Sequence, residues 1–507
     1  MKADELLELI GEAEDAHIQS AGAPKKHSRR TGWLSALAAC LCLVLGGIWM
    51  LQHLGGNAGT GGRSDQIYMN YVGPVLPLSV MEDAGELSAL RHIGLDFSPY
   101  EGIPLTDPDG ETQTRWRSEI LVTDQYILSN ESGQDQTVTL LYPHIGSLRQ
   151  TEFFPTLTVN GEAVPVTPHP GPYSGGFSGV WGADDPDGTC NLALIDRFEG
   201  YETLLSTDDY LRSAFDAFPD LDIPVVVYRL QDFEYTADEE AESPSMLVEF
   251  SMDYDQTQIL TYGFNGAAFD RENGSRSCIK GAIEHRPDAP PGYQEPDDGF
   301  ILILGREPTS YTLQGYRNGG CEAGDDLNDL KCMIVRSEST LNEMLAYLMD
   351  DFYGRADWYQ DHPELAQGLV IELLVTFGVL GESPVERYDS NMLEDLFSAA
   401  AMDRRVIYFS VPVTIPAGAQ ITVEASMLRD ESCDFTGPDQ GKDGYDLATR
   451  LGSRLHFTGQ SADISGWETV DIVGQNFGFD PAGGITEVTL DLNQPHYWIE
   501  VRRHPAE

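Results

Sequence analysis

Short apolar or alternating runs, bounded by Gly, Pro, Asn and Asp, dominate the chain after residue 66. Such runs predict antiparallel β-strands, and those expected early are 67–80, 119–128, 137–142 and 156–159. Strands return near the C-terminus, at 406–411, 421–425, 454–457, 469–473, 486–490 and 497–501. Between these regions, apolar residues at helical spacing predict helices at 201–215, 340–353 and 364–380. The pattern therefore predicts a mainly β fold with an α+β middle.

One N-terminal segment has a different pattern, because residues 33–51 carry no charged side chain over 19 positions. A helix of this length is about 28 Å long, close to the ~30 Å hydrocarbon thickness of a bilayer. Four basic side chains lie at 25–30, whereas Arg63 is the first basic residue after the segment. The positive-inside rule then predicts a single-pass protein of the cell membrane, with a cytoplasmic N-terminus and the bulk of the chain extracytoplasmic. The alternative is a cleaved signal peptide, for which small residues at 56–58 offer a site.

Composition divides the exported part into a tether and three folded units. The Gly-rich stretch 52–65 is typical of a flexible linker. The predicted units are a β-sandwich at 66–200, an α+β domain at 201–402 and a second β-sandwich at 403–507.

The cytoplasmic stub, residues 1–32, contains a predicted amphipathic helix. Leu6, Leu9 and Ile10 share one face of it, and acidic residues gather towards its N-terminus. So short a helix cannot bury its apolar stripe alone, so we expect these three residues to dock on a cytoplasmic regulatory protein. Alternatively, the stub only helps membrane insertion.

The acidic Leu-rich helix is followed by Gly11-Glu12-Ala13, a basic cluster and one span. In this order the first fifty residues resemble the stubs of uncharacterised bacterial single-pass membrane proteins with an anti-sigma-factor-like N-terminus. The resemblance implies a regulatory partner in the cytoplasm. The zinc-binding class of such domains uses a His with a Cys-x-x-Cys pair, but this stub has no cysteine before Cys40, so no zinc site is implied.

Charge narrows the range of partners. The chain has 82 acidic and 31 basic residues and a formal net charge of −51. Nucleic-acid binding depends on Lys and Arg displacing counterions, so this charge excludes it.

Acidic loops at 107–111, 184–188 and 439–446 lack the EF-hand spacing. We therefore predict no cofactor and no metal site, with structural calcium as the alternative.

No residue pattern in the chain identifies a catalytic site. Ser277 and Lys280 match Ser-x-x-Lys, but the companion Lys-Thr-Gly element is absent from the sequence. Paired carboxylates, as in glycosidases, cannot be located from sequence, so that class stays without named residues. The sequence favours a protein without enzymatic activity.

A loop rich in Gly, Pro and Asp, at 168–190, is the best candidate for a ligand site. It spaces Tyr173, Phe177 and Trp181 four residues apart, and long loops of this kind are often functional. Aromatic rings beside carboxylates are suited to a surface glycan or a peptide. The alternative is that the rings cap the sandwich core.

Five cysteines follow the span. Cys321 and Cys332 flank a polar loop and are candidates for a disulfide, which would contribute about 3 kcal/mol by closing that loop. The alternative is that they are small buried thiols.

These observations predict a membrane-anchored extracytoplasmic binding or sensing protein of the bacterial envelope, regulatory through its stub. The alternatives are an anchored enzyme that processes envelope glycans or peptides, and a surface adhesion or scaffold protein.

Overall fold

A computed structural model describes residues 68–504 except 84, 99–101, 107–111, 117–118, 174–194, 239, 282, 284–297, 355, 377–379, 381–391 and 438. For the hairpin of β4 (Gly102–Thr106) and β5 (Thr112–Trp116) only the backbone is described. The predicted span at 33–51, the linker 52–65 and the stub residues Leu6, Leu9 and Ile10 lie outside the described residues. Among the helices of residues 68–504 that are described, none is long and apolar enough to cross a membrane.

Three sheets form one body, which we call the sandwich. The largest has the order β26 (Glu487–Leu490), β24 (His456–Ser465), β3 (Leu87–Asp96), β6 (Ile120–Asn130), β21 (Gln420–Arg429), β8 (Thr156–Val159) and β9 (Glu162–Ala163). The second is β10 (Thr167–Pro170), β20 (Arg405–Ile415), β7 (Gln136–Gly146) and β2 (Ser79–Val80). The third is β1 (Pro74–Val75), β23 (Asp443–Ala448), β27 (His496–Arg503) and β25 (Val470–Gln475), with β22 (Ser432–Cys433) beside β23. Short 3₁₀ turns lie at Thr151–Phe153, Trp467–Thr469 and Pro481–Gly483.

Strands from 74–170 and strands from 405–503 build the sandwich together, so the two predicted domains at 66–200 and 403–507 are wrong as separate units. Strand β20 pairs along its whole length with β7, and β21 pairs with β6. Strand β24 runs parallel to β3. Alternation predicts which side of a strand is buried but not which strand lies beside it, and this is why sequence alone divided one body into two.

Residues 224–402 form a second body, the insert, placed within the sandwich sequence. One of its sheets is β13 (Thr257–Tyr262), β16 (Gly299–Gly305), β11 (Pro224–Glu234) and β19 (Lys331–Thr340). The other is β14 (Gly266–Asp270), β15 (Ser275–Lys280), β12 (Ser245–Ser251), β17 (Ser310–Tyr316) and β18 (Asp326–Leu327). Its helices are α6 (Leu341–Tyr353), α7 (Asp357–Asp361), α8 (Pro363–Thr376) and α9 (Leu393–Met402). This body therefore combines two antiparallel sheets with helices.

The predicted helix at 201–215 is two short helices that precede the insert and pack on the sandwich instead. They are α4 (Phe198–Leu204) and α5 (Asp209–Ser213). Their buried tyrosines, Tyr201 and Tyr210, share an apolar cluster with Val406 of β20. The middle domain predicted at 201–402 therefore starts too early, since its first residues belong to the sandwich.

Strand β16 shows how the layers of the insert arise from sequence. Its residues are apolar on both faces, as expected of a strand covered on both sides. Ile301 and Ile303 face the second sheet, in one cluster of buried side chains. Phe300, Leu302 and Leu304 belong to the larger cluster that contains the helices. The insert is therefore a stack of two sheets and one helical layer.

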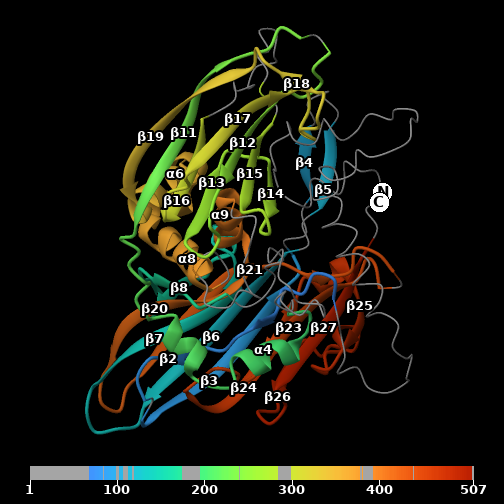
Figure 1. Cartoon of the computed structure of the whole chain (residues 1–507). Coiled ribbons are helices and arrows are strands. Elements are labelled where there is room, and N and C mark those ends of the chain that lie inside the picture. The colour runs from blue at the N-terminus through green and yellow to red at the C-terminus, as the bar shows by residue number, and fades with distance from the viewer. Residues whose placement is uncertain are drawn as a thin grey trace.

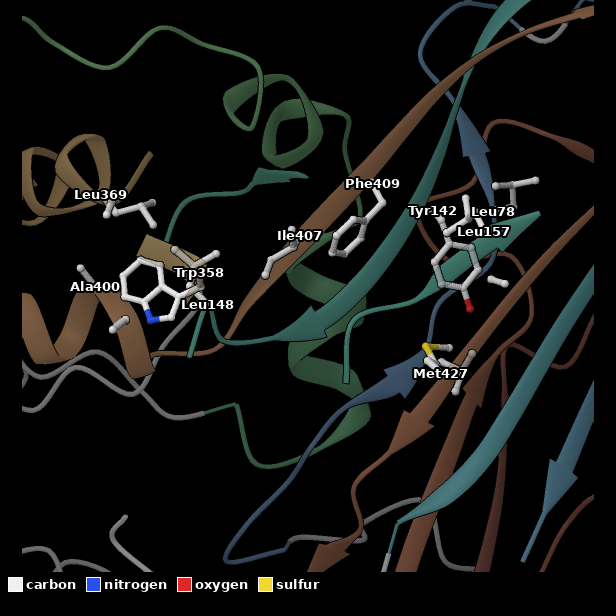
Figure 2. Close-up of a cluster of buried hydrophobic side chains, with 14 of the residues drawn as sticks. Leu78, Tyr142, Leu148, Leu157, Trp358, Leu369, Ala400, Ile407, Phe409 and Met427 are labelled. Atoms are coloured by element: carbon white, nitrogen blue, oxygen red, sulfur yellow. The ribbon is translucent and has the colours of Figure 1, made fainter. Parts of the chain in front are cut away.

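The helical layer joins the two bodies. Figure 1 shows the insert above the sandwich, with the orange helices α8 and α9 between them. In Figure 2, Leu369 of α8 and Ala400 of α9 lie on the side of the insert, and Ile407 and Phe409 continue the cluster into the sandwich. We call the meeting place of α8, the C-terminus of α9, residues 170–173 and the start of β20 the waist.

Candidate functional site

The waist brings Tyr173, one of the three predicted ligand residues, next to charged side chains. Tyr173 follows β10 and is half-buried, packed against the main core. Its backbone N–H donates to Glu372 Oε1 of α8 at 3.0 Å, and the guanidinium of Arg405 lies over its ring, 5.9 Å from the centroid. Phe177 and Trp181 lie outside the described residues.

Arg405, the first residue of β20, is the centre of this group. Its side chain is 1% exposed, and Nη1 donates to Glu372 Oε2 at 2.6 Å and to the carbonyl of Gly171 at 3.3 Å. Nε and Nη2 are buried and have no hydrogen-bond partner. These two nitrogens form the fork with which arginine binds a planar carboxylate. The two donors of this fork, Nε and Nη2 of Arg405, therefore form no hydrogen bond in the structure.

Asp403, between α9 and β20, adds an incompletely paired carboxyl group. Its Oδ2 is buried and has no hydrogen-bond partner, and burial raises the pKa of Asp403 to about 7, opposed by the charge of Arg405. Burial also raises the pKa of Tyr173; the charge of Asp403 raises it further and that of Arg405 lowers it. The three groups therefore share one electrostatic environment, in which a proton can be taken up near neutral pH.

A second buried arginine shows what complete pairing looks like. Arg91, in the centre of the sandwich, donates through Nε and Nη2 to the two carboxylate oxygens of Asp124, each at 2.8 Å. The hydroxyl groups of Tyr126 and Tyr142 donate to the same carboxylate at 2.7 and 3.1 Å. Both ionic side chains are 0% exposed. This network has the character of a structural element of the core.

Next to the waist, at the end of the sandwich, lies a small cleft of about 10 Å³, roughly the space of one water molecule. It is lined by Val72, His144, Ile145, Gly146, Gln150, Phe153, Arg404, Leu428, Arg429 and Asp430. Sequence reasoning did not identify this cleft, because its residues come from segments far apart in the chain.

A Ser–His–Asp chain occurs on the open face of the large sheet. His92 Nδ1 lies 2.8 Å from Ser461 Oγ, and His92 Nε2 lies 2.8 Å from Asp463 Oδ1. Acyl transfer also needs backbone donors directed at a developing oxyanion. Strand β24, which carries the serine, is paired with β3 on one side and β26 on the other, so its N–H groups serve the sheet. We interpret this set as a cross-strand polar cluster.

The strand that carries Ser277 and Lys280 shows that the Ser-x-x-Lys match is not a catalytic pair. Ser277 and Lys280 lie three apart on β15, and residues three apart on a strand point to opposite faces. Lys280 Nζ donates to the carbonyl of Gly263 at 2.8 Å. The lysine therefore cannot activate the serine.

The predicted disulfide does not occur in this structure. Cys321 and Cys332 are both free thiols; Cys321 sits in the loop before β18 with φ of 50°, and Cys332 packs against the insert core from β19.

Of the three acidic loops, 107–111 and 184–188 lie outside the described residues, and in the third Lys442 pairs with Asp439. Over the described part of the chain, no three His, Cys, Asp or Glu side chains gather as metal ligands would.

The comparisons add no relative to this picture. No protein-family model matches the chain, and no curated protein matches it in sequence.

Arg405, Asp403 and Glu372 were not among the predicted site residues, although one signal was present in the sequence. Glu372 is the only charged residue in the apolar run 369–380. A single acid on a buried helix needs a partner, and Arg405 directly precedes a buried strand. Together they indicate an internal ion pair.

Proposed function

We propose that the chain is a membrane-anchored binding protein of the bacterial envelope, whose exported part senses a small carboxylate-bearing ligand at the waist. In this proposal residues 33–51 form the anchor, and the stub 1–32 engages a cytoplasmic regulator. The observation that carries the proposal is the unpaired Nε/Nη2 edge of Arg405.

The energetic argument rests on burial. A buried donor left without a partner costs about 1–3 kcal/mol, and more when it is charged. A carboxylate on the fork of Arg405 offsets that cost with two charge-assisted hydrogen bonds. Asp403, protonated near neutral pH, supplies a further donor to the same ligand group. The waist is thus chemically complementary to a carboxylate.

The position of Arg405 links ligand binding to the way the insert sits on the sandwich. Its two unpaired nitrogens are shielded from solvent, so a ligand enters only when α8 or α9 moves relative to the sandwich. A ligand that binds the opened and closed arrangements differently shifts their populations. Such a shift changes how the insert sits on the sandwich, which is the property a sensor needs.

Ligand binding is tested with the full chain in lipid nanodiscs, by thermal unfolding in a panel of small carboxylates and their uncharged amides. We expect at least one carboxylate, but not its amide, to raise the melting temperature. Arg405→Lys keeps the charge but loses the fork, so it should abolish most of the rise. Arg336→Gln, an exposed arginine of the insert, is the matched control and should retain it. If no carboxylate stabilises the chain, the waist is not a carboxylate site.

Topology is tested separately in intact bacterial cells expressing the chain with a tag before residue 1. External protease should remove the exported part and leave the tagged stub intact. Loss of the tag from intact cells would overturn the proposed orientation.

A further inference from the structure

The guanidinium at the waist has a counter-charge before any ligand arrives. Arg405 is 1% exposed and donates through Nη1 to Glu372 Oε2 at 2.6 Å, so this ion pair balances it. Glu372 is held in place by a second donor, because its Oε1 accepts the backbone N–H of Tyr173 at 3.0 Å. Asp403 is a further acid in the field of the same guanidinium. The three side chains are therefore neutral together when Asp403 is protonated, and carry one negative charge when it is ionised.

Other charged or titratable groups that the structure describes around Asp403 do not change this count. Arg149, in the turn after β7, is exposed, so solvent screens its charge. Arg404 directs Nη1 to the carbonyl of Tyr71 at 2.9 Å, and the charge that opposes the pKa shift of Asp403 is that of Arg405. Tyr173 and Tyr210 stay neutral, because burial raises the pKa of both hydroxyl groups.

A ligand carboxylate on the Nε/Nη2 fork of Arg405 adds a negative charge in a place shielded from solvent. Two carboxylates side by side in such surroundings cannot both stay ionised, so one of them takes up a proton. The fork holds the ligand in its ionised form through two hydrogen bonds. Oδ2 of Asp403 is buried and has no hydrogen-bond partner, so Asp403 is the group that accepts the proton.

From this charge count and these unpaired atoms we infer that the ligand binds at the waist together with one proton, which Asp403 holds. The inference rests on the proposed carboxylate site. The proton comes from solvent, no covalent bond of the ligand changes, and the new O–H of Asp403 donates to a ligand oxygen. A sensor of this kind responds to a carboxylate and to acidity together, because acid supplies the proton that binding requires.

The sign of the pH effect follows from the two states of Asp403. Its pKa in the chain without ligand is about 7, and a bound anion raises that pKa further. Below pH 7 the proton is already in place, so the dissociation constant is nearly independent of pH. Above pH 7 the proton must be taken up on binding, so the dissociation constant rises by up to about tenfold per pH unit.

The test is isothermal titration calorimetry of the full chain in lipid nanodiscs with sodium acetate, propionate and benzoate, each titrated separately. Each titration is made at pH 6 and pH 8, in two buffers with different heats of ionisation, so that the difference in heat counts the protons exchanged. The probes stay ionised at both pH values, because ordinary carboxyl groups have a pKa near 4. We expect about one proton taken up per ligand at pH 8, almost none at pH 6, and about tenfold weaker binding at pH 8.

Two variants assign the proton to Asp403. Asp403→Asn places an amide N–H donor where the protonated carboxyl group stands, so it should bind equally well at both pH values and take up no proton. A purely structural role of Asp403 predicts instead weaker binding at both pH values. Glu394→Gln is the matched control, because burial raises the pKa of this second carboxyl group at the other end of α9 to about 7. It should keep the proton uptake of the unaltered chain.

The outcomes separate this inference from the proposed function. Binding without proton uptake at pH 8, or undiminished uptake in Asp403→Asn, overturns the inference and leaves the carboxylate site standing. No binding of any of the three probes at either pH counts against the carboxylate site itself, and the inference falls with it. If Asp403→Asn does not fold, the proton counts of the unaltered chain at the two pH values decide alone.

Discussion

The centre of the sandwich and the waist each bury an arginine, but they complete its hydrogen bonds differently. Arg91 uses its whole fork on Asp124, and two tyrosines complete that carboxylate. Arg405 is as deeply buried, yet its fork has no partner, and Glu372 binds only the remaining nitrogen. A buried network with every group paired stabilises one fold. An incomplete network at the junction of two bodies leaves binding capacity for another molecule.

Breaking the complete network should have the largest effect. Arg91→Met leaves Asp124 buried with only its tyrosine donors, and we expect a loss of about 3–5 kcal/mol in the free energy of unfolding. Urea unfolding of the full chain, followed by tryptophan fluorescence, measures it. The double variant Arg91→Met with Asp124→Leu removes both charges and should recover much of the loss. If the single variant loses less than about 1 kcal/mol, the network is not the structural element described here.

The stability of the folded chain should depend on pH through Asp403 at the waist. Its pKa in the folded chain is about 7, well above the ordinary value near 4 of an unfolded chain. The folded state therefore holds a proton between these values, so stability falls as pH rises from about 4 to 7. We expect a change on the order of 2 kcal/mol between pH 5 and 7.

Two variants separate this contribution from that of a second carboxyl group. Burial also raises the pKa of Glu394, at the other end of α9, to about 7. The free energy of unfolding should depend less on pH in Asp403→Asn, and less in Glu394→Gln as well, because each variant removes one of the two carboxyl groups. Unfolding experiments at fixed urea and varied pH measure both changes. An unchanged slope in Asp403→Asn would show that this group is not protonated in the folded chain.

Arg405→Met should cost less than Arg91→Met, about 1–2 kcal/mol. The reason is that only Nη1 has partners to lose, and Glu372, 19% exposed, keeps solvent and the N–H of Tyr173. Urea unfolding under the same conditions gives the ratio of the two costs. Equal costs would mean that the fork of Arg405 is satisfied in solution, which would contradict the contrast between the two regions.

The sequence pattern predicted the positions of strands and helices well, but it did not predict which strands lie side by side. The apolar runs at 406–411 and 421–425 are strands, and those at 340–353 and 364–380 contain helices α6 and α8. The interleaving of the two chain ends was missed, because alternation reports burial of a face and leaves the partner strand open. Pairing of β20 with β7 joins residues more than 250 positions apart, beyond the reach of any local signal.

For the site, the sequence could predict that charged residues are buried together, but not how their atoms are paired. The single charge of Glu372 in an apolar helix indicates a buried partner, and Asp403-Arg404-Arg405 before a buried strand supplies candidates. Which nitrogens of Arg405 stay unpaired depends on how α8, α9 and β20 meet in space. That geometry comes from packing of the whole core, so no pattern of residues near Arg405 contains it.

The smallest effect should come from an arginine that is paired but exposed. Arg336 binds Glu307 at 2.8 Å and Glu338 at 3.0 Å, with its side chain 42% exposed. Hydrogen bonds from Arg336 and then Tyr228 lower the pKa of Glu307 to about 2, so any stability from this pair is lost as pH falls from about 4.5 to 2. Solvent screens such pairs, and many contribute nothing measurable at neutral pH. Arg336→Gln should therefore shift the urea midpoint at pH 7 less than Arg405→Met does. A shift of equal size would show that burial is not what distinguishes the arginines of this chain.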